Sequence, residues 1–103
     1  MKTEKRKKLE AAGWKVGNVQ EFLGLTPSEA EFVEIKLALA RKLREFREKH
    51  HWTQAELAKR VGSSQSRVAK MEAADPTVSV DLLVRSLLAA GANRRDLGRA
   101  VAS

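Results

Sequence analysis

Residues 52–72 read WTQAELAKRVGSSQSRVAKME, and this stretch decides the fold of the 103-residue chain. Thr53 is placed to cap a helix, and Glu56, three residues later, completes a capping box. Leu57, Ala58 and Val61 then give that helix one apolar face. Gly62 can adopt the positive φ that ends a helix. The pattern predicts a short helix that ends at a tight turn.

A second short helix is predicted directly after that turn, capped by Ser63 or Ser64. At 100° per residue, Val68 and Met71 fall on one of its faces. The opposite face carries polar, cationic and small residues: Gln65, Ser66, Ala69, Lys70 and Ala73. Glutamine can pair with adenine and lysine with guanine, while small residues allow close approach to a groove floor. An ordinary solvated face is the alternative, but the caps, the glycine turn and the positive charge together favour DNA contact.

The string QAELAKRVGSSQSRVAKME resembles the helix-turn-helix of the Cro/CI-type (XRE, lambda-repressor-like) DNA-binding family. The matching positions are Gln54, Ala55, Leu57, Ala58, Val61, Gly62, Gln65, Ser66, Val68 and Glu72. The resemblance covers residues 37–91. It implies an all-α fold, a compact five-helix lambda-repressor-like domain with an N-terminal extension and a long first helix. It also implies a DNA-binding transcriptional regulator that is not an enzyme.

The same resemblance implies a role for each DNA-facing residue. Three side chains would reach base edges: Gln65, Ser66 and Lys70. Five would contact the DNA backbone: Gln54, Ser64, Arg67, Lys59 and Arg60. Gln54 would in addition brace Gln65.

The chain departs from the family after Glu72, where relatives commonly have Asn-Gly and this sequence has Ala73-Ala74-Asp75-Pro76. Ala74 in a left-handed conformation would cost on the order of 1 kcal/mol relative to glycine. Alternatively, the helix runs on to Ala74 and stops before Pro76. In either case, the phosphate contact of the family's asparagine is missing.

Thr26-Pro27-Ser28-Glu29 is a second clear helix start, and no breaker follows until His50. The pattern predicts a helix of roughly 24 residues, near 36 Å long. Its apolar stripe comprises Phe32, Ile35, Leu39, Leu43 and Phe46. The family needs only the second half, so residues 28–36 must be buried by the N-terminal segment or by a second subunit.

Two more helices are predicted after the helix-turn-helix. Ser79 can cap the first, which ends at Gly91 and is apolar enough to be buried on more than one side. Asn93 with Asp96 begins the second. In relatives the corresponding end helps dimerisation, so Leu97 and Val101 are candidates for a dimer contact.

The predicted division is an N-terminal extension over residues 1–26 and a helix-turn-helix domain over residues 27–103. The extension contains a basic arm and a short helix ending near Gly24, and it is a candidate partner-binding segment. A net charge of +7 favours a polyanionic partner. The absence of cysteine removes thiolate chemistry, and the adjacent His50 and His51 lack the spacing of metal ligands. No cofactor, metal or membrane span is expected, and a bacterial or phage cytoplasmic location fits.

Three functions remain open from the sequence. The first is the antitoxin of a type II toxin–antitoxin pair, similar to the HigA group, which represses its operon and binds a cognate toxin. The second is a stand-alone phage- or operon-type repressor. Both would act as a homodimer on a pseudo-palindromic operator in double-stranded DNA. The third is an adaptor or coactivator that keeps the fold without reading DNA.

Overall fold

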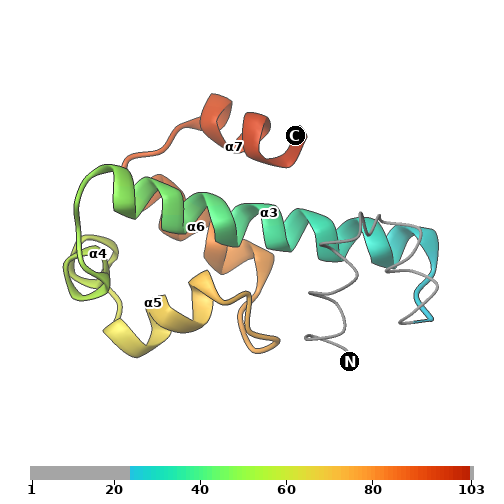
Figure 1. The fold of residues 1–103 in the computed structure, drawn as a ribbon, viewed down its shortest axis with the longest axis horizontal. Helices are drawn as coiled ribbons and strands as arrows, with labels where there is room; N and C mark the ends of the chain where they lie inside the picture. The colour runs from blue at the N-terminus through green and yellow to red at the C-terminus, as the bar shows by residue number, and fades with distance from the viewer. Residues whose placement is uncertain (1–23, 103) are drawn as a thin grey trace. The chain divides into compact units, whose positions relative to one another are not determined.

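The computed structural model describes residues 24–102, and this part of the chain contains five helices and no strand (Figure 1). The helices are α3 (Pro27–Lys49), α4 (Gln54–Val61), α5 (Gln65–Glu72), α6 (Val80–Ala90) and α7 (Arg94–Ala102). The predicted all-α, lambda-repressor-like fold is confirmed. The basic arm and the short helix expected before Gly24 lie outside the described residues.

The chain divides into two compact units, Met1–Glu34 and Ile35–Ser103, so the division falls inside α3. The second unit contains α3 from Ile35 onward, the helix-turn-helix, α6 and α7. The functional boundary expected after residue 26 stays a prediction.

The start of α3 matches the expected capping box. The Thr26 backbone N–H donates to Glu29 Oε1 at 2.8 Å, and the Glu29 N–H donates to Thr26 Oγ1 at 3.2 Å. The helix has 23 residues, close to the predicted length. Within its first turns Ala30 is fully buried, whereas Phe32 is 54% exposed. The chain itself therefore leaves Phe32 largely uncovered, and the expectation that a second subunit covers it stays a prediction.

The core of the second unit lies where α3, α4, α5 and α6 meet. Its largest fully buried side chains are Leu39, Leu43, Leu57, Met71, Leu83, Leu87 and Val68. Each buried leucine contributes about 1.5–3 kcal/mol relative to an exposed one. Ala92, in the connection to α7, also lies in this core, and Leu97 of α7 packs against it. The interior thus rests mainly on aliphatic residues, in a chain of which only 5% is aromatic.

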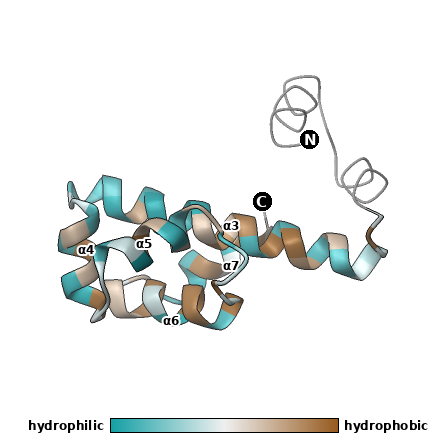
Figure 2. Cartoon of the chain, turned by 90° about the horizontal axis from the view of Figure 1, so that it is seen from below, coloured by the Kyte–Doolittle hydropathy of each residue, from teal (hydrophilic) through white to brown (hydrophobic). Residues whose placement is uncertain are grey.

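The last two helices, α6 and α7, begin with the capping residues that were predicted from the sequence. The Leu82 N–H donates to Ser79 Oγ at 3.0 Å, and α6 ends at Gly91 with φ 118°. At the start of α7, the Asn93 and Asp96 side chains each accept the other's backbone N–H, both at 2.9 Å. However, α6 is not buried all round, because Leu88 is 46% exposed. Apolar residues on α6 appear as brown segments in Figure 2, while teal residues mark α4 and α5.

Candidate nucleic-acid interface

The turn between α4 and α5 is held by capping groups at both helix ends. The Thr53 side chain accepts the Glu56 N–H at 3.0 Å, and the Thr53 N–H donates to Glu56 Oε1 at 2.7 Å. Gly62 has φ 68°, in the left-handed region that glycine adopts without strain. Ser64, and not Ser63, caps α5 by accepting the Arg67 N–H at 3.2 Å. These short-range bonds set the angle at which α5 leaves α4.

The two faces of α5 differ sharply in exposure. Val68 and Met71 are 0% exposed and anchor the helix on the core. The opposite face is exposed at Gln65, Ser66 and Lys70, the residues expected to contact bases, and Arg67 is exposed beside them. The predicted separation of faces is thus confirmed, and it leaves hydrogen-bonding groups directed away from the core.

The C-terminal end of α5 is fixed by a buried ion pair that sequence reasoning missed. Arg47 Nε lies 2.6 Å from Glu72 Oε2, and Arg47 Nη2 donates to Glu72 Oε1 at 3.1 Å. The two side chains are only 15% and 6% exposed. The bond to Glu72 raises the pKa of Arg47, although burial opposes this. The pair ties the end of α3 to the end of α5.

Gln54 and Trp52 complete this network at the start of α4. The Gln54 side-chain amide donates to Glu72 Oε1 at 3.2 Å, and Arg47 Nη1 donates to the Trp52 carbonyl at 3.0 Å. The resemblance implied that Gln54 braces Gln65, but here its amide nitrogen is bound to Glu72. The cause is the buried Glu72 carboxylate, which is a stronger acceptor than an exposed amide.

After Glu72 the helix stops, so of the two alternatives for Ala74 the left-handed turn is the one that forms, and a continued helix is excluded. Ala73 keeps φ −88°, and Ala74 has φ 53°. The left-handed residue turns the chain so that the Asp75 N–H donates to the Lys70 carbonyl at 3.0 Å. Asp75 then accepts the N–H and the hydroxyl of Thr77, at 2.8 and 2.6 Å. These bonds from Thr77 lower the pKa of Asp75.

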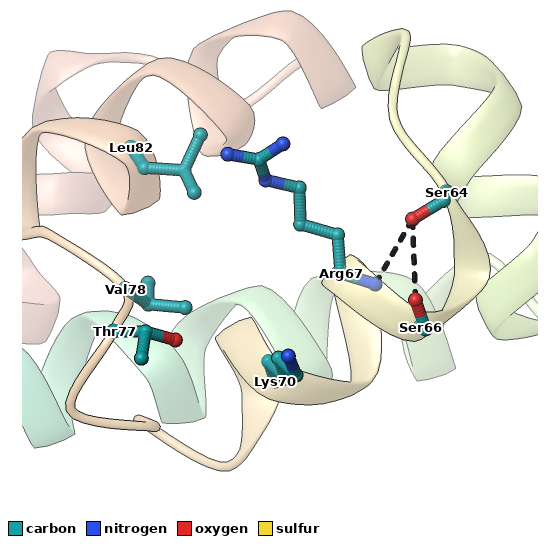
Figure 3. Close-up of a pocket in the computed structure, with 7 residues that line it drawn as sticks. All are labelled: Ser64, Ser66, Arg67, Lys70, Thr77, Val78 and Leu82. Carbon is teal, nitrogen blue, oxygen red and sulfur yellow. Dashed lines mark hydrogen bonds between the residues drawn. The ribbon is translucent and has the colours of Figure 1, made fainter.

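An open hollow of about 310 Å³ lies beside α5, between it and the start of α6 (Figure 3). Its lining comprises Ser64, Ser66, Arg67, Lys70, Thr77, Val78 and Leu82. Figure 3 shows the Arg67 side chain reaching across it towards Leu82. Two cations and several hydroxyl groups make this hollow suited to an anionic group such as a phosphate. The hollow thus brings together four of the residues predicted for DNA contact, and it adds Thr77.

Lys59 and Arg60 lie elsewhere, in a separate hollow with Trp52 and Glu56. The Arg60 guanidinium carbon is 4.1 Å from the centre of the Trp52 ring, a cation–π contact. His50 stacks on the Trp52 ring at 4.6 Å and on the Phe46 ring at 4.5 Å. The His50 Nδ1 also lies 2.9 Å from the Phe46 carbonyl oxygen. His50 therefore closes α3 within an aromatic stack, a role that the sequence did not reveal.

The two dimer candidates on α7 differ in exposure. Leu97 is half-buried against the core, whereas Val101 is 41% exposed. Within residues 24–102, no three side chains of the metal-binding types gather into a site. In the same residues, no helix has both the length and the apolar character to cross a membrane.

A comparison with protein-family models gives a match. A protein-family model described as Helix-turn-helix matches residues 43–85, from the second half of α3 to the middle of α6. The comparisons with curated proteins and with solved structures gave no match. Residues 43–85, which contain α4, α5 and the turn between them, are therefore similar to a helix-turn-helix family, and that similarity supports DNA binding by this part of the chain.

Proposed function

We propose that this chain is a sequence-specific transcriptional repressor that places α5 in the major groove of its operator. The observation that carries the proposal is the exposed row of Gln65, Ser66 and Lys70 on a helix whose other face is fully buried. A helix held in this way presents its polar side chains in one defined orientation, as base recognition requires. Gln65 and Lys70 have the chemistry to read adenine and guanine.

The contacts to the DNA backbone fall into two groups. Ser64 and Arg67 adjoin the base-reading residues and share the hollow beside α5, so a phosphate placed there would fix the register of the helix. Gln54 lies at the start of α4, where it can reach a phosphate through the part of its amide that does not bind Glu72. Lys59 and Arg60 add positive charge from the other hollow.

The repressor is proposed to act as a homodimer. Two copies related by a two-fold axis would place their α5 helices in successive major grooves, with half-sites about 34 Å apart. The operator would then be a pseudo-palindrome. Val101 of α7, exposed on the protein surface, is one candidate for the contact between copies.

The first experiment is selection of bound duplexes from a random library at about 150 mM salt, followed by sequencing. Base readout predicts recovery of an inverted repeat. The double variant Gln65→Ala with Lys70→Ala should lower affinity for that repeat by about 1–3 kcal/mol per residue and leave random DNA almost unaffected. Retention without sequence preference, lost as salt rises, would contradict the proposal.

Within this function, the antitoxin role competes with that of a stand-alone repressor. The antitoxin hypothesis is supported by the residues that precede the helix-turn-helix domain, which are a candidate toxin-binding segment. Purification of the protein together with the product of the adjacent gene would test it, because an antitoxin forms a stoichiometric complex that suppresses the toxicity of that product.

One observation favours the hypothesis that the protein is an adaptor: the Ala73-Ala74 pair stands where the family commonly has Asn-Gly. This pair removes the asparagine that would contact a phosphate. An adaptor would show equal, weak binding to all duplexes, and substitution of Gln65 and Lys70 would not change it.

A further inference from the structure

A second basic hollow lies between α3 and α7, on the side of α3 opposite α5 (Figure 1). It has a volume of about 290 Å³ and is lined by Ala38, Arg41, Lys42, Glu45, Arg99 and Ala100. Half of these residues are cationic, and the two alanines are too short to fill the space. The hollow therefore combines room for a side chain with a positive rim.

The positive charge around this hollow exceeds the negative charge close to it. Arg99 pairs with Asp96 at 3.0 Å, and Asp96 also accepts the Asn93 N–H at 2.9 Å. That backbone bond, together with Arg99 and Lys42 nearby, lowers the pKa of Asp96. Arg41 has no ion pair within residues 24–102 and is exposed. The rim can thus accept a further carboxylate.

The first turns of α3 carry the complementary chemistry. Glu31 is exposed and Glu34 is half-buried, and neither forms an ion pair with any residue in the described range. Phe32 lies between them and is 54% exposed, the largest exposure recorded for a bulky apolar residue in that range. The two carboxylates can pair with the cations of the hollow. Phe32 between them can pack on an exposed apolar residue of α7, such as Val101.

We infer that the α3–α7 hollow of one copy binds Glu31 and Glu34 of a second copy, with Phe32 packed against the exposed Val101. The inference rests on the homodimer of the proposed function and names its contact surfaces. Because each copy carries both surfaces, a two-fold axis makes the contact reciprocal. Two sets of charge pairs and two apolar contacts then hold the dimer.

The observations favour a second copy over DNA as the occupant. Helix α5 and helix α7 lie on opposite sides of α3 (Figure 1), so a duplex bound by α5 would not cover this hollow. A sugar-phosphate backbone would also leave Phe32 and Val101 exposed, whereas a second copy buries both. The contact therefore leaves α5 free to bind its operator.

The test uses charge reversal in the full-length chain. One variant carries Glu31→Lys with Glu34→Lys, and the other carries Arg41→Glu with Arg99→Glu. Each alone should raise the dimer dissociation constant at least about 100-fold, because like charges then meet at both contacts. An equimolar mixture should form a heterodimer, since opposite charges meet again at both contacts. Light scattering after size-exclusion chromatography measures the mass in each case.

A matched control carries Arg44→Glu with Arg85→Glu, at exposed positions outside the hollow, and it should remain dimeric. Circular dichroism shows whether each variant is folded. A monomeric wild type, or variants that stay dimeric, would overturn the inference. Two monomeric variants that do not associate when mixed would overturn it as well.

The test of this dimer contact can fail without the test of sequence-specific DNA binding failing, and the reverse also holds. If the wild type is a dimer of this kind but selects no DNA sequence, the contact stands and the repressor proposal fails. If the variants are dimeric and the wild type recovers an inverted repeat, the repressor stands and its dimer contact lies elsewhere.

Discussion

Ala74 is, with His51, one of the two residues other than glycine that have a positive φ in the described part of the chain. Its φ of 53° places a Cβ atom in the left-handed region, which costs about 1–2 kcal/mol for a residue other than glycine. The strain is retained because the turn lets Asp75 bond to the end of α5 and then to Thr77. The turn also places Thr77 at the hollow beside α5.

Ala74→Gly should therefore stabilise the protein, by about 1 kcal/mol. Loss of the methyl group that packs against the core offsets part of the gain, but the relief of strain is larger. Thermal unfolding should show a melting temperature higher by a few degrees, roughly 4 °C or more. Ala73→Gly is the matched control, because Ala73 has φ −88° and glycine there should be neutral or destabilising. Equal effects at both positions would contradict this account.

Asp75 makes the same turn sensitive to acid. Bonds from Thr77 lower the pKa of Asp75 from 3.8, so the ionised carboxylate stabilises the folded state more than the unfolded state. This contribution is complete above the unfolded pKa and is lost as pH falls through the folded pKa. Between about pH 6 and about pH 3, the free energy of unfolding should fall less in Asp75→Asn than in the wild type. Urea titrations over that range measure the difference, and parallel curves would show that Asp75 has no such role.

The element that depends most on distant residues is α5. It has only eight residues, and a helix so short is not stable alone in water. Its position comes from Val68 and Met71 in the core and from Glu72 bound by Arg47. The ion pair thus connects the orientation of the candidate base-reading face to the end of α3.

Glu72→Ala should destabilise the fold by about 3–5 kcal/mol, because Arg47 is then left largely buried without its counter-charge. The double variant Arg47→Met with Glu72→Leu should be much less destabilised, since no unpaired charge remains. Urea unfolding of the three proteins measures both effects. If the double variant lost more stability than Glu72→Ala, desolvation would not be the main cost.

At the scale of the whole molecule, charge sets how strongly the protein binds any DNA. Each phosphate neutralised by a cation adds about −0.9 to the slope of the logarithm of affinity against the logarithm of salt concentration. Arg67→Ala should lower the magnitude of this slope by about 1 and weaken operator and random duplexes alike. Arg85→Ala is the control, because Arg85 is exposed on α6 and pairs with Asp81. A loss confined to the operator would assign Arg67 to base reading instead.

The sequence by itself determined the local structure of the described helices. Capping residues such as Thr26, Thr53 and Ser79, and the left-handed Gly62, act through bonds that span only a few residues, so their spacing can be read directly. The apolar spacing of Val68 and Met71 likewise separated the buried face of α5 from the exposed face. The DNA contacts inferred from that exposed face still await measurement.

Only the tertiary structure decided which side chains meet across elements. The Arg47–Glu72 pair joins residues 25 positions apart, and the Asp75 carbonyl accepts Lys36 Nζ from 39 positions away. The conformation of Ala74 was also left open, because a continued helix and a strained turn cost similar energies locally. Packing of α5 against α3 and α6 selects the turn, and no pattern within a single helix carries that information.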